Sequence, residues 1–386
     1  MKLILVASNY FPMNDVSSLR IHSYCKALAK KGIDITILIV YGQKGFQKSQ
    51  IYVNEGVKFQ FLENYISPSK GKFSKFFRRI SGFLTIHSFI RTHGINAVLT
   101  YHDNFFSNIF IRMILINSSI PYIIDKTEYP YGYKMMSQFK KKWTHLNLRL
   151  FDGFIVISDE LSKFYSQFSK KVFLLPMTID PDRFSNTDEI TDFNEHLPYI
   201  ALTFGTHNRD GLFDSVRTYF HYLNLNPSKK MKLLLIGDFP SLVSKFPEMN
   251  AIQHFLVERG LSDLVIFAGK QSLMKVPSLL RNATCLLTTA KEYVSGGFPT
   301  KLGEYMLSGV PVVATNAGEI SQYVNNGEDI FLCNVQNYQC LAEHIFEIQN
   351  NSELGKLIGQ RAIQTASIKF NASTYITQLL NFIKHV

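Results

Sequence analysis

The sequence predicts an α/β protein built from two Rossmann-like domains, each with a parallel sheet covered by helices. Its 386 residues exceed the roughly 250–300 residues at which a single hydrophobic core stops growing. Short apolar runs alternate with helical patterns, as they do when helices cover both faces of a parallel sheet. One polar stretch without periodicity, 186–198, divides this rhythm into two halves.

The start of the chain shows the rhythm. The apolar run Leu3–Ser8 predicts a buried strand and not a secretion signal, because no small-residue cleavage site follows it. The next segment carries apolar residues at helical spacing, which predicts one buried helix face: Ile21, Tyr24, Cys25 and Leu28. Gly32 then stands where a left-handed helix end is favoured, and Asp34–Val40 predicts the second strand.

Similar apolar runs predict ten further strands along the chain. They are Ala97–Tyr101, Tyr122–Asp125, Gly153–Ser158, Val172–Leu175, Tyr199–Phe204, Lys232–Gly237, Leu264–Gly269, Thr284–Thr289, Pro311–Thr315 and Ile330–Cys333. The expected organisation is therefore a first Rossmann-like domain at 1–185, a linker at 186–198 and a second Rossmann-like domain at 199–370. A C-terminal helix at 371–386 is expected to pack back towards the first domain. Ligands of such folds bind beyond the carboxyl ends of the strands, which predicts sheets facing across a cleft.

Composition narrows the class of protein. An apolar fraction of 46% is typical of a folded globular chain. No stretch reaches the roughly 20 uninterrupted apolar residues of a membrane span, and with no signal we expect a cytoplasmic protein. Four scattered cysteines without C-x-x-C spacing predict four reduced thiols: Cys25, Cys285, Cys333 and Cys340.

The net charge of +11 favours anionic partners such as phosphate groups, nucleic acid or anionic lipid. Residues 67–91 hold six basic side chains and no acid, with aromatic and aliphatic residues between them at helical spacing. This pattern fits a basic amphipathic helix lying on an anionic membrane. It fits equally a helix whose aromatic face packs on the first domain while its basic face is solvated. No nucleic-acid-binding motif is visible, so nucleic acid is not an expected partner.

The segment 284–315 carries the strongest functional pattern. A strand ending near Ala290 leads through the glycine-bearing loop Lys291–Phe298 into a helix that starts at Pro299. Free N–H groups and the positive end of the helix dipole make such a helix start an anion site. Thr300 and Glu304 share one side of the helix, where Glu304 can accept hydrogen bonds from two ribose hydroxyls. The alternative is an ordinary βαβ unit with a solvated glutamate.

This segment resembles the retaining GT-B glycosyltransferases known as family 4. The matching residues are Glu304, Tyr305, Met306, Gly309, Pro311, Val312, Val313 and Ala314. The resemblance implies that Glu304 holds the donor ribose. It also implies that the residues at the helix start face the donor sugar and its diphosphate: Gly297, Phe298, Pro299, Thr300 and Lys301. The pattern departs from the family at Gly296, where the first of two glutamates is expected, and Glu292 lies further upstream.

Other segments match the family in the expected order. Thr203–Gly205 followed by Arg209 resembles the first strand of the second domain and a basic residue that binds the donor diphosphate, and Lys270 adds charge near the nucleotide. The resemblance makes the first domain acceptor-binding and the second nucleotide-sugar-binding. Arg20, one turn into the first helix, is a further candidate for donor binding if it faces the cleft, and the alternative is a solvated arginine. On the acceptor side the resemblance favours Glu128 as the group that orients or deprotonates the reacting hydroxyl. His102 is the second candidate, with a structural role as its alternative.

The resemblance implies transfer of a sugar, with retention, from a UDP- or GDP-sugar to a glycan or lipid-linked acceptor. The expected setting is bacterial surface polysaccharide or glycoconjugate synthesis at the inner membrane face. Because no carboxylate cluster has metal-binding spacing, we expect no cofactor beyond the nucleotide-sugar co-substrate and no obligatory metal. A sugar-nucleotide epimerase of the same shape and a non-catalytic donor-binding subunit stay open. The lack of any G-x-G-x-x-G disfavours a nicotinamide enzyme.

Overall fold

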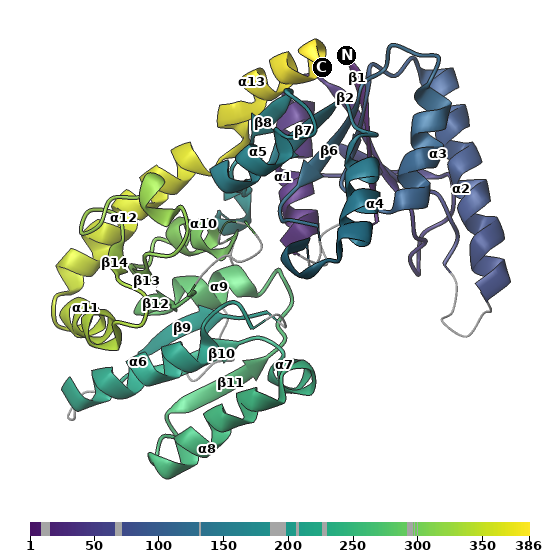
Figure 1. Ribbon diagram of the computed structural model, residues 1–386. Helices are drawn as coiled ribbons and strands as arrows, with labels where there is room; N and C mark the ends of the chain where they lie inside the picture. Colours follow the sequence, from purple (N-terminus) through teal and green to yellow (C-terminus); the bar gives the residue numbers. More distant parts are fainter. Residues whose placement is uncertain are drawn as a thin grey trace. The chain divides into compact units, whose positions relative to one another are not determined.

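A computed structural model describes residues 1–8, 16–65, 72–130, 133–185, 198–205, 208–225, 230–291, 296, 298 and 300–386. At 16, 72–81 and 83 it describes the backbone alone. The chain divides into two compact units (Figure 1). The first comprises Met1–Asp180, Ser295–Gly297 and Asn371–Val386, and the second comprises Pro181–Val294 and Phe298–Phe370. All of the predicted linker except Pro198 lies outside the described residues.

The first unit contains an eight-stranded sheet with the order β3-β4-β2-β1-β5-β6-β7-β8. Its strands are β1 (Lys2–Ala7), β2 (Asp34–Ile39), β3 (Ile51–Asn54), β4 (Val57–Phe61), β5 (Ala97–Thr100), β6 (Tyr122–Lys126), β7 (Gly153–Val156) and β8 (Val172–Leu174). Its helices are α1 (Val16–Lys30), α2 (Lys72–His93), α3 (Phe105–Leu115), α4 (Gln138–Leu148), α5 (Asp159–Tyr165) and α13 (Ala372–His385), with a short 3-10 turn at Tyr133–Met135.

One pair of strands in this sheet was not predicted. β3 and β4 form an antiparallel hairpin, so the expectation of a wholly parallel sheet is wrong at this edge. Glu55 and Gly56 make the two-residue turn with φ of 47° and 82°, the left-handed values that such tight turns require. The sequence does carry a signal for this hairpin. The β-branched residues of Ile51–Asn54 stand at alternate positions, and the turn that follows reads Asn-Glu-Gly. The other strand pairs of this sheet are parallel.

The core of the first unit forms where the predicted face of α1 meets the sheet. Tyr24, Cys25 and Leu28 are fully buried, and Gly32 has the expected left-handed φ of 78°. Helix α13 covers the same core with the buried side chains of Ile376, Leu379 and Ile383. Each such side chain stabilises the packing by about 1.5–3 kcal/mol. The last segment of the chain is therefore part of the first unit, and Asn371 also forms a parallel bridge with Ile179.

The second unit contains a wholly parallel six-stranded sheet with the order β11-β10-β9-β12-β13-β14. Its strands are β9 (Tyr199–Thr203), β10 (Lys232–Ile236), β11 (Val265–Gly269), β12 (Cys285–Thr288), β13 (Val312–Thr315) and β14 (Phe331–Cys333). Its helices are α6 (Leu212–Leu225), α7 (Phe239–Lys245), α8 (Ala251–Glu258), α9 (Val276–Arg281), α10 (Thr300–Leu307), α11 (Tyr338–Asn350) and α12 (Ser352–Lys369). Short 3-10 turns occur at η2 (Pro181–Phe184), Pro247–Asn250 and Ile320–Gln322.

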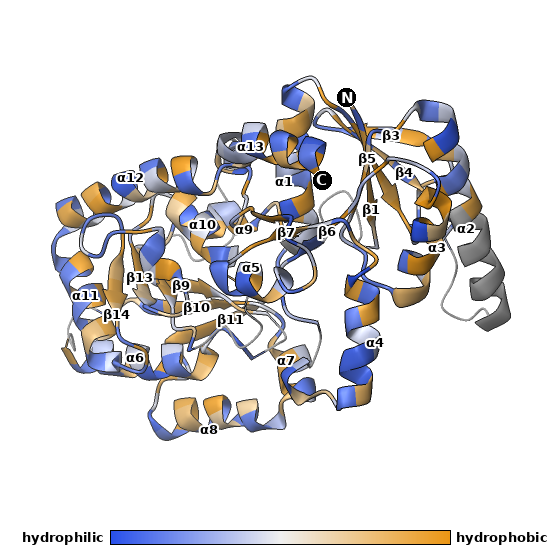
Figure 2. Cartoon of the chain, turned by 45° about the horizontal axis from the view of Figure 1, so that its top comes forward, coloured by the Kyte–Doolittle hydropathy of each residue, from blue (hydrophilic) through white to orange (hydrophobic). Residues whose placement is uncertain are grey.

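The strand order of the second sheet is that of a doubly wound fold, 3-2-1-4-5-6. The strands are apolar, and the helices alternate apolar and polar residues, as expected for elements that cover a buried sheet (Figure 2). All twelve predicted strands are present to within two residues at either end.

The order of the second sheet reverses between β9 and β12, and the loops after these two strands run to opposite faces of the sheet. Folds of this kind bind ligands at that point, beyond the carboxyl ends of the strands.

Two cysteines are paired, so the expectation of four reduced thiols is wrong. Cys333 ends β14 and Cys340 lies in the first turn of α11, and their sulfurs form a disulfide with a Cα–Cα distance of 6.0 Å. The chain reversal between strand and helix brings them together, which their spacing along the sequence does not reveal. Cys25 and Cys285 are free and buried.

Among the residues that the structure describes, no helix combines the length and the apolar character that a bilayer crossing needs. The backbone of 72–91 lies within α2, and Ile86, Phe89 and Ile90 near its end are buried. Most of the basic side chains of 67–91 lie outside the described residues.

Helix α10 is positioned by a close backbone contact with α12. Leu302, Tyr305 and Met306 bury one face of α10, and Gly309 ends the helix with φ of 76°, as the sequence predicted. Helix α12 packs against this end of α10 at Gly359. A Cβ atom at Gly359 would lie 1.9 Å from the carbonyl oxygen of Gly309. Only glycine allows this approach, so Gly359 sets how deeply α10 sits against the rest of the second unit.

We expect Gly359→Ala to destabilise the protein by about 1–3 kcal/mol, because the methyl group forces α12 away from the end of α10. Gly355→Ala, one turn earlier in the same helix, is the matched control. Its Cβ would meet its nearest neighbours at 3.4 and 3.5 Å, which is ordinary contact, and alanine favours the helix. Denaturant unfolding monitored by circular dichroism measures both. Equal effects of the two substitutions would contradict the packing argument.

Candidate functional site

The first turn of α10 is tied to the loop that follows β9. The ammonium of Lys301 lies 2.6 Å from Oδ1 of Asp210 and donates a hydrogen bond to the carbonyl of Thr203 at 3.0 Å. The other oxygen of Asp210 accepts a hydrogen bond from the backbone N–H of Gly205 at 2.6 Å. These contacts hold the start of α10 at the carboxyl end of β9, where the strand order reverses.

A second link joins α10 to the same strand. The hydroxyl oxygen of Tyr305 accepts a hydrogen bond from the backbone N–H of Thr203 at 2.6 Å and lies 3.1 Å from its hydroxyl. Burial raises the pKa of Tyr305 above its ordinary value, so the hydroxyl stays protonated at neutral pH. Tyr305 therefore fixes the rotation of α10 about its axis, and this rotation presents Lys301 and Glu304 on the face away from the core.

Glu304 forms an ion pair with Arg183, a residue that the sequence analysis missed. Both side chains are largely buried, with exposed fractions of 10% for Arg183 and 17% for Glu304. Nη2 of Arg183 also donates to the carbonyl of Leu273 at 2.9 Å, which anchors the guanidinium. Arg183 comes from η2, the Pro-Asp-Arg-Phe turn at the start of the second unit. The only sequence signal was a basic residue close to the predicted end of the first domain at 185.

The loop after β9 and the end of β12 touch through their backbones. Gly211 has φ of 64°, and a Cβ atom there would lie 2.0 Å from the carbonyl oxygen of Thr289. The hydroxyl of Thr289 donates to the carbonyl of Gly211 at 2.7 Å and lies 2.7 Å from the hydroxyl of Ser215. The backbone on both sides of the reversal is therefore rigidly placed next to the Lys301–Asp210 pair.

The remaining predicted donor residues fall into three groups. Arg209, in the loop after β9, and Lys270, directly after β11, are both exposed. Phe298 is buried, with its ring centroid 4.9 Å from Tyr323 and 5.7 Å from Phe370, so its side chain anchors the loop. Thr300 begins α10 and is half-buried. Gly297 and Pro299 lie outside the described residues.

Gly296 stands where the resemblance places a glutamate, and its backbone explains the difference. Its φ is 72°, a left-handed value that L side chains adopt only with strain. A glutamate at this position would need a different loop path. The upstream Glu292 lies outside the described residues.

Arg20 in α1 is buried, and four of its five N–H donors are used within the first unit. Nε and Nη2 donate to the two oxygens of Asp125 at 3.1 and 3.2 Å. Nη1 donates to the carbonyl of Pro176 at 2.7 Å, and Nη2 also donates to that of Leu175 at 3.0 Å. Arg20 therefore ties α1 to β6 and to the segment after β8, which neither reading of the sequence anticipated.

The two predicted acceptor-side residues follow neighbouring strands but differ in exposure. Glu128 lies after β6 and is exposed, and its backbone carbonyl accepts a hydrogen bond from the hydroxyl of Tyr165 at 2.9 Å. His102 lies after β5 and is buried, with Nε2 3.2 Å from the hydroxyl of Ser107. The β5 end borders the strand-order reversal of the first sheet, between β1 and β5.

A polar network beside His102 was also missed by sequence reasoning. Asp103 accepts hydrogen bonds from the ammonium of Lys126 at 2.5 Å and from the amides of Asn147 at 2.9 Å and Asn108 at 3.2 Å. Burial alone would raise the pKa of Asp103, but the Lys126 ammonium and these donors outweigh it and hold the pKa below its ordinary value. The carboxylate therefore stays charged and orders the carboxyl ends of β5 and β6.

Charges at the second-unit cluster are balanced in pairs. Lys301 faces Asp210, and Arg183 faces Glu304. A bound anion gains little from a cation that is already neutralised, so Lys301 and Arg183 are poorly placed to bind phosphate. The carboxylate of Glu304 is suited to accept hydrogen bonds from neutral hydroxyls.

Comparison with known proteins relates part of the second unit to glycosyltransferases. Residues 199–351 match the family model described as Glycosyl transferases group 1. N-acetyl-alpha-D-glucosaminyl L-malate synthase of Bacillus anthracis is 28% identical over 147 residues, which cover 38% of this chain and 35% of that protein. An uncharacterized glycosyltransferase of Methanocaldococcus jannaschii is 32% identical over 109 residues, which cover 28% of this chain and 30% of that protein. The chain thus matches about a third of the length of these curated relatives.

Solved structures resemble the chain over its whole length. Sucrose-phosphate synthase of Thermosynechococcus elongatus has a TM-score of 0.72 at 17% identity and covers 100% of this chain and 98% of its own. Anabaena HepE in complex with UDP-glucose has a TM-score of 0.67 at 14% identity, with 100% of both chains covered. WaaG, a glycosyltransferase involved in lipopolysaccharide biosynthesis, has a TM-score of 0.64 at 14% identity, also with 100% of both covered. The chain therefore has the GT-B fold of two Rossmann-like domains.

We expect Arg20→Met to destabilise the first unit by about 3–5 kcal/mol, because it leaves the carboxylate of Asp125 buried without its partner. The matched control is Arg112→Met. Arg112 forms an ion pair with Asp152 at 2.8 Å, but their side chains are 37% and 28% exposed, so its loss should cost about 1 kcal/mol or less. Urea unfolding of both variants measures the difference. An Arg20→Met protein as stable as the control would contradict a structural role for Arg20.

Proposed function

We propose that the chain is a glycosyltransferase that moves a sugar from a nucleotide-diphosphate sugar to an acceptor hydroxyl. The donor binds in the second unit at the carboxyl ends of β9 and β12. The observation that carries this proposal is that the segment matching the glycosyltransferase family model contains α10, whose Lys301 contacts the end of β9 where the strand order reverses. Doubly wound folds bind nucleotides at this point.

In this proposal Glu304 accepts hydrogen bonds from the donor ribose hydroxyls. Its ion pair with Arg183 supports the role, because the guanidinium fixes the direction of the carboxylate. Arg183 is thus a positioning residue for Glu304. Lys301 has a similar supporting part, since it holds the start of α10 through Asp210 and the Thr203 carbonyl.

The diphosphate then binds to Arg209 and to the backbone amides around Gly297 to Thr300, with Lys270 adding positive charge. A sugar that departs from its diphosphate develops negative charge on the leaving group, and cations and helix dipoles stabilise that charge. We propose that these groups serve in place of an obligatory metal. The nucleotide-sugar is the only co-substrate that the proposal requires.

For the donor we propose a UDP- or GDP-sugar, which is supported by the likeness to a protein solved with UDP-glucose. For the acceptor we propose a glycan or a lipid-linked sugar, with retention at the anomeric carbon, in bacterial surface polysaccharide or glycoconjugate synthesis. The likeness to a lipopolysaccharide enzyme supports that setting. The basic segment 67–91 would then hold the enzyme on the anionic inner face of the membrane.

On the acceptor side we propose that Glu128 orients or deprotonates the reacting hydroxyl. Its exposure after β6 supports contact with a ligand, whereas the burial of His102 favours a positioning role through Ser107. Arg20 shapes the same region indirectly through Asp125.

One observation favours a second candidate, a donor-binding subunit without turnover. Gly296 replaces a glutamate of the family pattern, and its left-handed backbone disfavours a carboxylate there. Such a subunit would bind nucleotide-sugars through the same groups but would form no product.

The donor proposal is tested by thermal-shift measurements with UDP-, GDP- and ADP-sugars. A ligand at a hundred times its Kd stabilises the folded protein by about 2.7 kcal/mol, so one of the UDP- or GDP-sugars should raise the Tm clearly. Glu304→Gln should weaken that ligand about ten- to a hundredfold, because ribose then loses charge-assisted hydrogen bonds. Glu258→Gln, at the exposed end of α8, should bind as the unmodified protein does. If none of the nucleotide-sugars stabilises the protein, the donor site is wrong.

Turnover is tested with the donor identified in this way and a panel of glycan and lipid-linked acceptors. Glu128→Gln should lower kcat about a hundred- to ten-thousandfold while leaving nucleotide binding unchanged. The matched control Glu160→Gln removes another exposed carboxylate of the first unit, in the first turn of α5. Donor binding without product from the unmodified protein would favour the binding subunit. A donor epimerised in the absence of any acceptor would identify an epimerase.

A further inference from the structure

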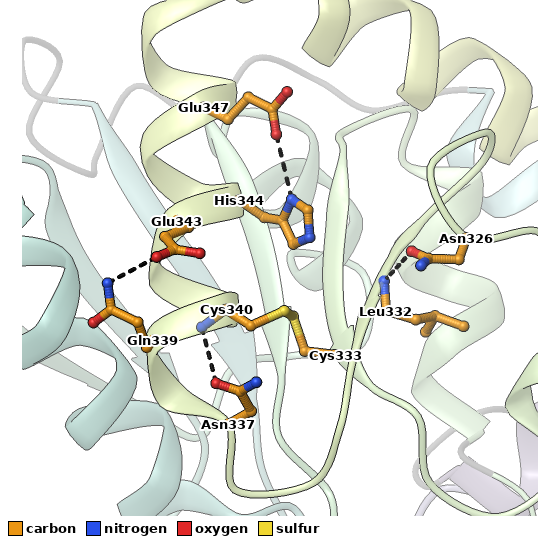
Figure 3. The surroundings of a disulfide bond; sticks show 9 residues. All are labelled: Asn326, Leu332, Cys333, Asn337, Gln339, Cys340, Glu343, His344 and Glu347. Atoms are coloured by element: carbon orange, nitrogen blue, oxygen red, sulfur yellow. Dashed lines mark hydrogen bonds and ion pairs between the residues drawn. A yellow bond between two sulfur atoms is a disulfide. The ribbon is translucent and has the colours of Figure 1, made fainter.

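The end of β14 and the first turns of α11 gather three metal-ligating side chains. Cys333 is the last residue of β14, Cys340 lies in the first turn of α11, and His344 follows one turn later on the same face of that helix (Figure 3). The two sulfurs and a ring nitrogen of His344 all lie within 4.8 Å of one another. The structure therefore places two thiol groups and an imidazole around one small volume.

This set of donors has a defined chemical preference. Thiolate and imidazole together select zinc among the common divalent cations, because Zn²⁺ is borderline soft and tetrahedral. Cys340 and His344 are spaced at i and i+4, so both project from one side of the helix, and Cys333 enters from a different element. Two ligands from a helix turn and one from a neighbouring strand end can surround an ion, whereas three ligands from one helix face cannot.

The imidazole is already held as a metal ligand would be. Nδ1 of His344 lies 3.3 Å from a carboxylate oxygen of Glu347, and the ring stacks on Phe331 with centroids 4.3 Å apart. A carboxylate on the far nitrogen fixes the tautomer of a metal-binding histidine and leaves Nε2 for the metal. Figure 3 shows the ring between Glu347 and the disulfide. Glu347 thus supplies the carboxylate contact to the far ring nitrogen that zinc-bound histidines commonly have.

In the oxidised protein the two sulfurs are bonded to each other and cannot both act as thiolate ligands. Reduction by a dithiol breaks the S–S bond. The dithiol gives two electrons and two protons, it becomes a disulfide itself, and both cysteines are left as thiols. Binding of a divalent cation then releases the two thiol protons to water. Cys340 is half-buried and the His344 side chain is 27% exposed, so solvent reaches the group.

We propose that Cys333, Cys340 and His344 form a zinc site that assembles when the Cys333–Cys340 disulfide is reduced, with water as the fourth ligand. The disulfide would link β14 to α11 in oxidising conditions, and the ion would link the same two elements in reducing conditions. The site lies three strands from β9, about 14 Å by the spacing of strands, so it is separate from the proposed donor chemistry.

A second group of ligand types does not support the same proposal. His22, Glu55 and Asp180 in the first unit also offer atoms within 4.8 Å of one another. There the ammonium of Lys26 forms ion pairs with both carboxylates, at 2.7 Å in the case of Asp180. A cation already occupies that position, and a metal ion would have to displace it.

The test is a Co²⁺ titration of the full chain after reduction with a phosphine, which does not itself offer thiol ligands. One equivalent of Co²⁺ should produce the thiolate-to-cobalt charge-transfer band and the intense visible bands of a tetrahedral site, and Zn²⁺ should abolish them. The oxidised protein should show neither band. Absence of the thiolate band from the reduced protein, or an equal spectrum from the oxidised protein, would overturn the proposal.

Variants identify the ligands. Cys340→Ser should abolish the charge-transfer band, and His344→Ala should weaken Co²⁺ binding by at least tenfold. Glu347→Gln should weaken it about ten- to a hundredfold through its contact with His344. Glu343→Gln is the matched control, since Glu343 lies on the same helix but accepts a hydrogen bond from Gln339 at 2.9 Å. Circular dichroism of each variant reports folding separately. A folded Cys340→Ser protein that retains the band would show that other thiols bind the ion.

Discussion

The reversal of strand order between β9 and β12 is the constraint on which the candidate site depends. In a parallel sheet covered on both faces, the carboxyl ends of all strands lie on the same side. Where the strand order reverses, the loops that follow the two neighbouring strands run in opposite directions. Lys301 and Tyr305 hold α10 at this edge through Thr203. The contact between Gly309 and Gly359 holds its other end. One end of α10 is thus held by side-chain hydrogen bonds to Thr203 and the other by a backbone contact, and Glu304 is presented by a rigid element.

The carboxyl ends of the strands in the first sheet are organised by paired charges. Arg20 joins α1 to Asp125 and to two backbone carbonyls, and Lys126 joins Asp103 to the neighbouring strand end. A buried pair such as Arg20–Asp125 contributes little net stability, but the loss of one partner is costly. These pairs therefore specify the geometry of the strand ends near Glu128 and His102. In both units, paired charges fix the geometry at the carboxyl ends of the strands.

Much of the fold could be predicted because its signals are local. Each buried strand is a short apolar run, and Gly32 and Gly309 mark helix ends by their left-handed backbone. The β3–β4 hairpin was missed because β3 has no buried residue and the turn has Glu where Asn or Gly is usual. Lys301 and Glu304 were found because they share a helix with the motif. Arg183 was not found, because the residue it contacts lies far along the chain.

By itself the sequence determined two α/β domains, the helix that carries Glu304 and the likeness of that helix to those of sugar-transferring enzymes. These depend on periodicity and spacing, which a chain carries locally. Only the tertiary structure decided which charges are paired: Arg183 with Glu304, Lys301 with Asp210 and Arg20 with Asp125. It also decided that Cys333 meets Cys340 beside His344. Pairing of side chains depends on how strands and helices cross, and no local pattern encodes that geometry.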